Sequence, residues 1–258
     1  MTLTDEEIYV TDIVKLESNK LDVEEPADVV CHKQGGVIVV AHGYAVSIYN
    51  LKGLELYSSY NLDLPPLSLC FSENGKQIVA ACESKIRIIS PKTGEIIKVA
   101  GNEFHKEEIS EIATSASIAL SGCIGGEVFV SGLAKGNILG KFESFKGVIN
   151  CLGFTDNYAL IAPQGDGLYW ANVNTFKIVF HSPSDVSVSA VCKVHSQNHL
   201  AVGDIDGNIH LLDSRAPMNI IKKIRAGNTI HSLTARGSQL YAACEDGYVR
   251  VFDISKHL

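Results

Sequence analysis

A short strand-and-turn pattern recurs six times along this chain at an almost constant interval. Each copy is an apolar run that ends in Asn, Ser or Asp, as in "SIYN", "RIIS" and "HLLD". Short polar side chains of these types favour turns, because they hydrogen-bond to the backbone that follows. A period of about 40 residues indicates a repeat protein in which each unit is one supersecondary element. The six polar residues, each 40 or 41 positions from the next, are Asn50, Ser90, Ser131, Asn172, Asp213 and Asp253.

Each unit contains short apolar runs separated by turns of Gly, Asn or acidic residues. In the fifth unit these runs are "VSAVCKV", "HLAVG", "IHLLD" and "NIIKKI". Runs of this length between turn residues predict antiparallel hairpins, and no stretch keeps a helical period over the length of a helix. Four strands in about 40 residues is the pattern of a propeller blade. The predicted fold class is all-β, a six-bladed β-propeller of four-stranded antiparallel blades.

The last unit holds only three strands, because the five residues after Asp253 are too few for a fourth. The apolar stretch 8–16, "IYVTDIVKL", precedes the first unit and has no partner within it. We therefore expect residues 8–16 to pair as the outer strand of the last blade and to close the ring. The predicted organisation is a single domain over residues 1–258, whose N-terminal segment 1–28 contains the closing strand.

Composition limits where such a chain can work. The hydrophobic content of 46% is sufficient for a large core, and no run approaches the roughly 18 apolar residues of a membrane span. The N-terminal "MTLTDEEIYV" has acids where a signal peptide has basic residues, which argues against secretion. We expect an intracellular protein, cytoplasmic or nuclear, that does not bind membranes.

Seven cysteines form no C-x-x-C pair and are odd in number, which favours reduced thiols over a disulfide framework or a zinc site. Three lie at the end of a second strand and four lie in first strands. This repeated placement predicts small core residues, not nucleophiles. The first group is Cys82, Cys123 and Cys244, and the second is Cys31, Cys70, Cys151 and Cys192.

The net charge of −7 is concentrated at the N-terminus. Of the 29 acids and 22 bases, residues 1–28 hold nine acids and two lysines, and the remaining charges cancel. The N-terminal segment is acidic and the rest of the chain has no net charge. Such a chain lacks the positive surface potential that binds phosphates, which argues against nucleic acid as a partner.

Over residues 27–258 the units resemble the WD40-repeat family. "DGNIHLLDSR" and "DGYVRVFDIS" are similar to that family's third strand, with an acidic-Gly turn before it and Asp at its end. "FHKEEISEIA" is similar to the Gly-His opening of a repeat, with His105 in the His place. The resemblance implies a propeller that acts as an interaction scaffold. It is partial, because no Gly-His dipeptide occurs and the family's Trp positions hold Tyr49, Ile89, Val130, Ala171, Leu212 and Phe252.

Candidates for chemistry are few. The stretch from Asp204 to Asn208 resembles the start of a calcium loop, but the twelfth position is Arg215, a cation, where the loop needs a carboxylate. A hairpin turn is the preferred interpretation. A metal-dependent hydrolase remains an alternative that would need acids in first strands, and those strands offer chiefly Asp28 and Glu111. No zinc, nucleotide or nucleophile motif is present. We expect no enzyme activity, no cofactor, no bound metal and no small-molecule substrate.

The leading functional hypothesis is a protein-interaction scaffold. Binding residues concentrate on loops held by a rigid framework, and acids outnumber bases in the loops between second and third strands and between blades. An acidic rim favours a basic protein partner, and a chaperone of a basic ribosomal protein is one alternative. The predicted contact residues are Asp63, Glu103, Phe104, His105, Glu107, Glu108, Phe145, Asp166, Asp185, Asp206 and Asp246.

Overall fold

The computed structural model of the 258-residue chain describes residues 2–3, 7–12, 17–32, 35–100, 104–156, 158–182, 187–194 and 199–255. Within these ranges the regular structure is β-strand, without an α-helix, and no helix has the length and apolar character to cross a membrane. The chain forms two compact units. Unit 1 comprises residues 1–124 and 129–140, and unit 2 comprises residues 125–128 and 141–258.

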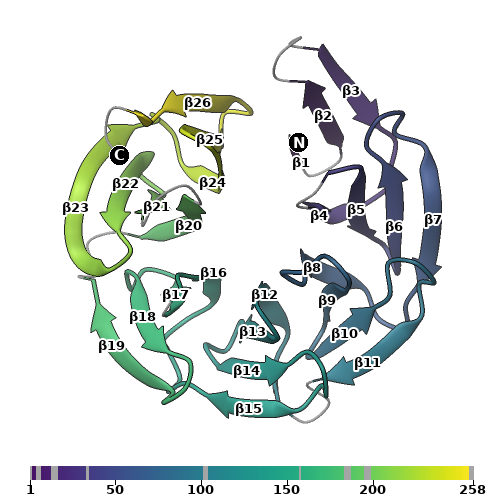
Figure 1. The fold of residues 1–258 in the computed structure, drawn as a ribbon, viewed down its shortest axis with the longest axis horizontal. Coiled ribbons are helices and arrows are strands. Elements are labelled where there is room, and N and C mark those ends of the chain that lie inside the picture. The colour runs from purple at the N-terminus through teal and green to yellow at the C-terminus, as the bar shows by residue number, and fades with distance from the viewer. Residues whose placement is uncertain are drawn as a thin grey trace. The chain divides into compact units, whose positions relative to one another are not determined.

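The six repeats form the six blades of an all-β propeller, as predicted. Within each blade the strands are antiparallel neighbours in chain order (Figure 1). The first three blades are β4 (Pro26–Cys31), β5 (Val37–His42), β6 (Ala45–Asn50) and β7 (Leu56–Asn61); β8 (Pro66–Phe71), β9 (Ile78–Cys82), β10 (Lys85–Ile89) and β11 (Ile96–Ala100); and β12 (Ile109–Ser115), β13 (Ile118–Cys123), β14 (Val128–Gly132) and β15 (Ile138–Lys141).

The fourth and fifth blades also have four strands each, and the described part of the sixth has three. They are β16 (Ile149–Phe154), β17 (Ala159–Pro163), β18 (Tyr169–Asn172) and β19 (Lys177–His181); β20 (Val188–Val194), β21 (His199–Asp204), β22 (Asn208–Asp213) and β23 (Ala216–Arg225); and β24 (Ile230–Arg236), β25 (Gln239–Cys244) and β26 (Val249–Asp253).

The recurring polar residue at the end of the third strand builds the same turn in several blades. Asn50, Asn172, Asp213 and Asp253 each accept a hydrogen bond from the backbone N–H two residues later, at 2.9 Å in every case. This Asx turn ends the strand and starts the connection that follows. The periodic marker in the sequence therefore has a direct structural cause.

A second repeated feature is a β-bulge near the start of every first strand. Register with the second strand shifts by one residue in all six blades, so one residue of the first strand is left unpaired. In two blades the bulged residue is a serine: Ser110 Oγ donates to the carbonyl of Gly122 and Ser189 Oγ to that of Gly203, both at 3.3 Å. The blades thus share local backbone geometry as well as strand order.

The second and third strands of the first five blades are buried on both faces, which explains their continuous apolar sequences. In unit 1, alternate residues of β5 pack in opposite directions. Val39 joins a cluster with Phe71 and Ile78 of the second blade, whereas Ile38 joins a cluster with Ile8 and Leu21 of the N-terminal segment. In unit 2 the corresponding clusters lie between the fourth and fifth blades and between the fifth and sixth.

The prediction for the N-terminal segment is wrong in one respect. Residues 8–12 form β2 (Ile8–Asp12), the middle strand of a separate three-stranded sheet between β1 (Thr2–Leu3) and β3 (Glu17–Leu21). β3 pairs with β2 along its whole length, because the two strands are close in sequence and pair as neighbours. A strand with neighbours on both sides cannot be the outer strand of another blade. Residues 13–16 of the predicted closing strand lie outside the described residues.

Candidate interaction surface

In the described part of the loop before the third blade, residues 104–108, His105 is anchored and the residues after it are exposed. His105 is buried, its Nε2 lies 2.7 Å from Ser121 Oγ, and its ring contacts Phe129 edge-on with centroids 4.7 Å apart. Phe104 lies over Phe129 at 6.2 Å. His105 therefore anchors the described part of the loop, and its side chain is buried.

Among the described residues of this loop, the exposed ones are one base, Lys106, and two acids, Glu107 and Glu108. The backbone around them is fixed at two points, because Ile109 N–H donates to the Glu83 carbonyl at 2.7 Å and Ile124 N–H donates to the Glu108 carbonyl at 3.0 Å. Ile124, at the tip of the adjacent turn, is 44% exposed. Of the predicted contact residues in unit 1, Glu107 and Glu108 are the ones best placed to meet a partner.

Asp63 is not a free acid. Arg87 of β10, which is 3% exposed, donates to both oxygens of its carboxylate, at 3.0 and 2.6 Å. This bidentate pairing holds the pKa of Asp63 below its usual range. Most of the charge of Asp63 is balanced within the protein, so the residue contributes little to an acidic field. Glu103 and Asp185, two other predicted contact residues, lie outside the described residues.

Phe145 and Asp166 come together in unit 2 around Tyr169. The Tyr169 hydroxyl donates to Asp166 Oδ2 at 2.7 Å, and Phe145 contacts the Tyr169 ring edge-on with centroids 4.9 Å apart. His181 stacks on the Tyr169 ring, with ring centroids 3.8 Å apart. Burial and the hydrogen bond to Asp166 raise the pKa of Tyr169 to about 12. Sequence analysis placed Phe145 and Asp166 on the same rim but missed Tyr169, which joins them.

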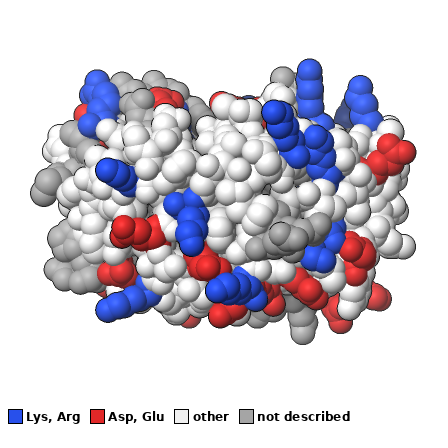
Figure 2. Space-filling model, turned by 90° about the horizontal axis from the view of Figure 1, so that it is seen from below, with Lys and Arg blue, Asp and Glu red and all other residues white. Residues whose placement is uncertain are grey.

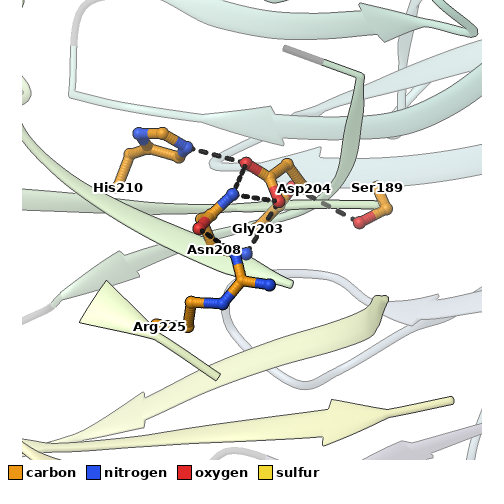
Figure 3. Close-up of polar contacts among 6 residues, drawn as sticks. All are labelled: Ser189, Gly203, Asp204, Asn208, His210 and Arg225. Carbon is orange, nitrogen blue, oxygen red and sulfur yellow. Dashed lines mark hydrogen bonds and ion pairs between the residues drawn. The ribbon is translucent and has the colours of Figure 1, made fainter. Parts of the chain in front are cut away.

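The Asp204–Asn208 stretch forms a buried hydrogen-bond network in place of a calcium loop (Figure 3). Asp204 Oδ1 accepts the Asn208 backbone N–H at 2.7 Å, and its Oδ2 lies 2.9 Å from His210 Nε2. Arg225 extends the network by donating to Asn208 Oδ1 at 3.3 Å. Burial alone would raise the pKa of Asp204, but the hydrogen bonds from Asn208 and His210 outweigh it and lower the pKa. The carboxylate thus holds the turn together, in agreement with the hairpin interpretation.

Asp206 and Asp246 occupy equivalent turns in the fifth and sixth blades. Asp206 is exposed. Asp246 accepts hydrogen bonds from Asn228 Nδ2 at 2.6 Å and from two Arg250 nitrogens at 2.8 and 2.5 Å. Arg250 lowers the pKa of Asp246 strongly. Only Asp206 of this pair is available as an uncompensated negative charge.

The two acids of first strands, Asp28 and Glu111, interact in unit 1. Both oxygens of Asp28 accept backbone N–H groups, from Val29 at 2.7 Å and from Leu69 at 2.6 Å. Burial, reinforced by the charge of Asp28, raises the pKa of Glu111 to about 8. Asp28 is thus held by two backbone N–H groups, and Glu111 binds its proton more strongly than an ordinary glutamate does. Elemental analysis of the purified protein would test the alternative of a metal-dependent hydrolase directly.

The cysteines lie where the repeat places them, at the ends of β9, β13 and β25 and within β4, β8, β16 and β20. Burial raises the pKa of Cys82 and Cys192 to about 12, which disfavours the reactive thiolate. Cys31 is exposed, so the prediction of a core position is wrong for this residue.

We expect Cys31 to react first with a thiol reagent in the native protein, and the six other cysteines to react slowly until denaturation. Mass-spectrometric mapping of labelled sites over time checks this order. Rapid native labelling of Cys82 or Cys192 at neutral pH would contradict it and would reopen the possibility of a nucleophilic cysteine.

Exposed apolar side chains at turn tips were missed by sequence reasoning. Tyr44 is 63% exposed and Ile124 is 44% exposed in unit 1, while Ile205 is 48% exposed and Tyr248 is 69% exposed in unit 2. A signal was available, because all four lie at or beside the turn between the second and third strands, where polar residues are the rule. Figure 2 shows charges of both signs interspersed over one side of the molecule, with wide uncharged areas between them.

Comparison with known proteins supports the fold alone. No protein-family model matches the chain, and no curated protein matches it significantly. The structure is similar to the crystal structure of Ika8, a computationally designed protein, with a TM-score of 0.70 and 17% sequence identity. The match covers 97% of this chain and 91% of Ika8. At this identity the similarity establishes a shared β-architecture and carries no information about function.

Proposed function

We propose that this protein is a non-enzymatic interaction scaffold that binds a basic protein partner through acidic loops at the ends of its blades. The observation that carries the proposal is the loop before the third blade. Its base is fixed by His105 and Ser121, and its exposed tip presents Glu107 and Glu108. A preorganised loop loses little conformational entropy on binding, and exposed acids attract basic partners over a distance.

We further propose that the chain is a divergent member of the WD40-repeat family. Support comes from the contact between His105 and Ser121 in the third blade, with Phe129 packed on the imidazole. The first blade has a His–Ser contact at a different place, since His42 at the end of β5 has its Nε2 2.7 Å from Ser47 Oγ of β6. His105 is the residue that stands in the His place of the resemblance. An intracellular location, cytoplasmic or nuclear, is consistent with the seven free thiols.

Replacing Glu107 and Glu108 together with Lys is expected to slow association with the partner at least tenfold at low salt, because four units of charge change on one loop. Thermal stability should change little, since both side chains are exposed. The measurement is the association rate of the purified partner, identified by affinity purification and mass spectrometry, at low and high salt.

The matched control is the double variant Glu55→Lys and Glu95→Lys. It makes the same charge change at exposed positions of unit 1, but on turns between third and fourth strands. We expect the control to leave the association rate within about twofold of the parent. Equal slowing by both variants would show that only net charge matters and would remove this loop from the proposed site.

A further inference from the structure

The turns of the fifth and sixth blades form one continuous surface within unit 2. The Ile205 carbonyl accepts the Thr229 hydroxyl at 2.8 Å, and the Thr229 carbonyl accepts the Glu245 N–H at 2.9 Å. Asn228 Nδ2 adds the bond to Asp246 already described. Hydrogen bonds therefore link the turn before β22, the connection before β24 and the turn before β26. We call this the turn surface, and its exposed side chains are those of Ile205, Asp206, Asn228, Glu245 and Tyr248.

Two large apolar side chains stand out on the turn surface. Tyr248 is 69% exposed and Ile205 is 48% exposed. Hairpin turns ordinarily carry polar residues, because their side chains face water. Exposed aromatic and aliphatic side chains ringed by polar groups are a mark of protein-binding sites. The Arg250 guanidinium carbon lies over the Tyr248 ring, 5.9 Å from its centre.

The uncompensated charges among the residues of the turn surface are negative, and exposed Arg225 lies beside it, where it donates to Asn208. Arg250 is neutralised by Asp246 through two hydrogen bonds. Asp206 and Glu245 are exposed, and neither forms an ion pair within the part of the chain that the structure describes. Each of these acids neighbours one of the apolar residues in sequence or lies on the same turn. The turn surface thus combines two apolar contacts with two available carboxylates.

We propose that the turn surface binds a segment of a partner protein in which apolar side chains alternate with Arg or Lys. The apolar side chains would cover Ile205 and Tyr248, and the cations would meet Asp206 and Glu245. This inference rests on the proposed scaffold function and deepens it, because it assigns the partner's chemistry and a second site in unit 2. Apolar contact supplies the binding free energy and the charges supply orientation and rate.

The test uses three fluorescent twelve-residue peptides and measures binding by anisotropy. The probe alternates Arg and Leu, one comparison alternates Arg and Ser, and the other alternates Glu and Leu. We expect the Arg-Leu peptide to bind at least tenfold more tightly than either comparison. Equal affinity for the Arg-Leu and Arg-Ser peptides would show that charge alone drives binding. Higher affinity for the Glu-Leu peptide would show that the surface prefers negative charge. Either result overturns the inference.

Two double variants locate the binding. Ile205→Ser with Tyr248→Ser removes the apolar contacts, and Asp206→Lys with Glu245→Lys reverses the charges. Each should weaken Arg-Leu binding at least tenfold with little change in melting temperature, because all four side chains are exposed. Controls are Val179→Ser, which removes a 55% exposed apolar side chain of β19, and the Glu55→Lys and Glu95→Lys variant.

The two proposals fail in different ways. If only the reversal of Glu107 and Glu108 weakens the binding of the Arg-Leu peptide and of the purified partner, the scaffold function stands and the turn surface is overturned as a binding site. If the turn-surface variants weaken binding of the Arg-Leu peptide but no basic protein partner is found, the turn surface is upheld as a peptide-binding site and the proposed function fails. Self-association of the parent and the variants is measured by analytical ultracentrifugation. If a turn-surface variant self-associates less than the parent, the occupant is a second copy of this chain and the inference is overturned.

Discussion

Replacing Glu111 with Gln is expected to stabilise the protein by about 3 kcal/mol at pH 7. Burial and the neighbouring Asp28 raise the pKa of Glu111 from 4.5 to about 8. Between these two values the unfolded chain releases the proton while the folded protein keeps it. The free energy of unfolding therefore falls as pH rises from about 5 to 8. Gln keeps the shape of the side chain but does not ionise, so this loss disappears in the variant.

Urea unfolding of the parent and the variant at pH 4, 5, 6, 7 and 8 measures the effect. The two proteins should be almost equally stable at pH 4, and the advantage of the variant should grow steadily up to pH 8. Glu107→Gln serves as the control, because Glu107 is exposed, and it should show no such trend. A stability difference that is constant with pH would mean that Glu111 does not titrate as proposed.

Replacing Trp170 with Ala is expected to lower the free energy of unfolding by about 3–5 kcal/mol. The side chain is 1% exposed and belongs to the cluster between the fourth and fifth blades, where it contacts Phe180 with ring centroids 5.4 Å apart. Removing it leaves a cavity that strands on both sides cannot readily close. Equilibrium unfolding in urea or guanidinium checks the loss.

Two further variants separate cavity formation from other causes. Trp170 Nε1 has no hydrogen-bond partner among the described residues, so Trp170→Phe should cost much less than Trp170→Ala. Tyr248→Ala removes another large aromatic residue, but one that is 69% exposed, and should change stability by no more than about 0.5 kcal/mol. Similar losses for Trp170→Ala and Tyr248→Ala would contradict the assignment of Trp170 to the core.

Local chemistry made the blade predictable. The ends of third strands at Asn50, Asn172, Asp213 and Asp253 followed from short polar residues in the sequence, because an Asx turn involves only a residue and the backbone just after it. The burial of Cys82, Cys123, Cys151 and Cys244 followed from the same repeat, whereas Cys31 is exposed. Pairing of the N-terminal residues was predicted wrongly, because β2 found its neighbour in the adjacent β3, and a sequence period says nothing about a segment that lies outside the repeat.

The sequence by itself determined the fold class, the number of repeats and the positions of the turns, since each depends on contacts between residues close in the chain. Only the tertiary structure decided which acidic residues of the loops remain unpaired and can meet a basic partner. Asp63 and Asp246 carry the same charge as Asp206 in the sequence, yet Arg87 and Arg250 neutralise the first two. His105 likewise became an anchor through Ser121. Such pairings depend on which side chains the strand register brings within about 3 Å of each other, and a 40-residue period does not encode that.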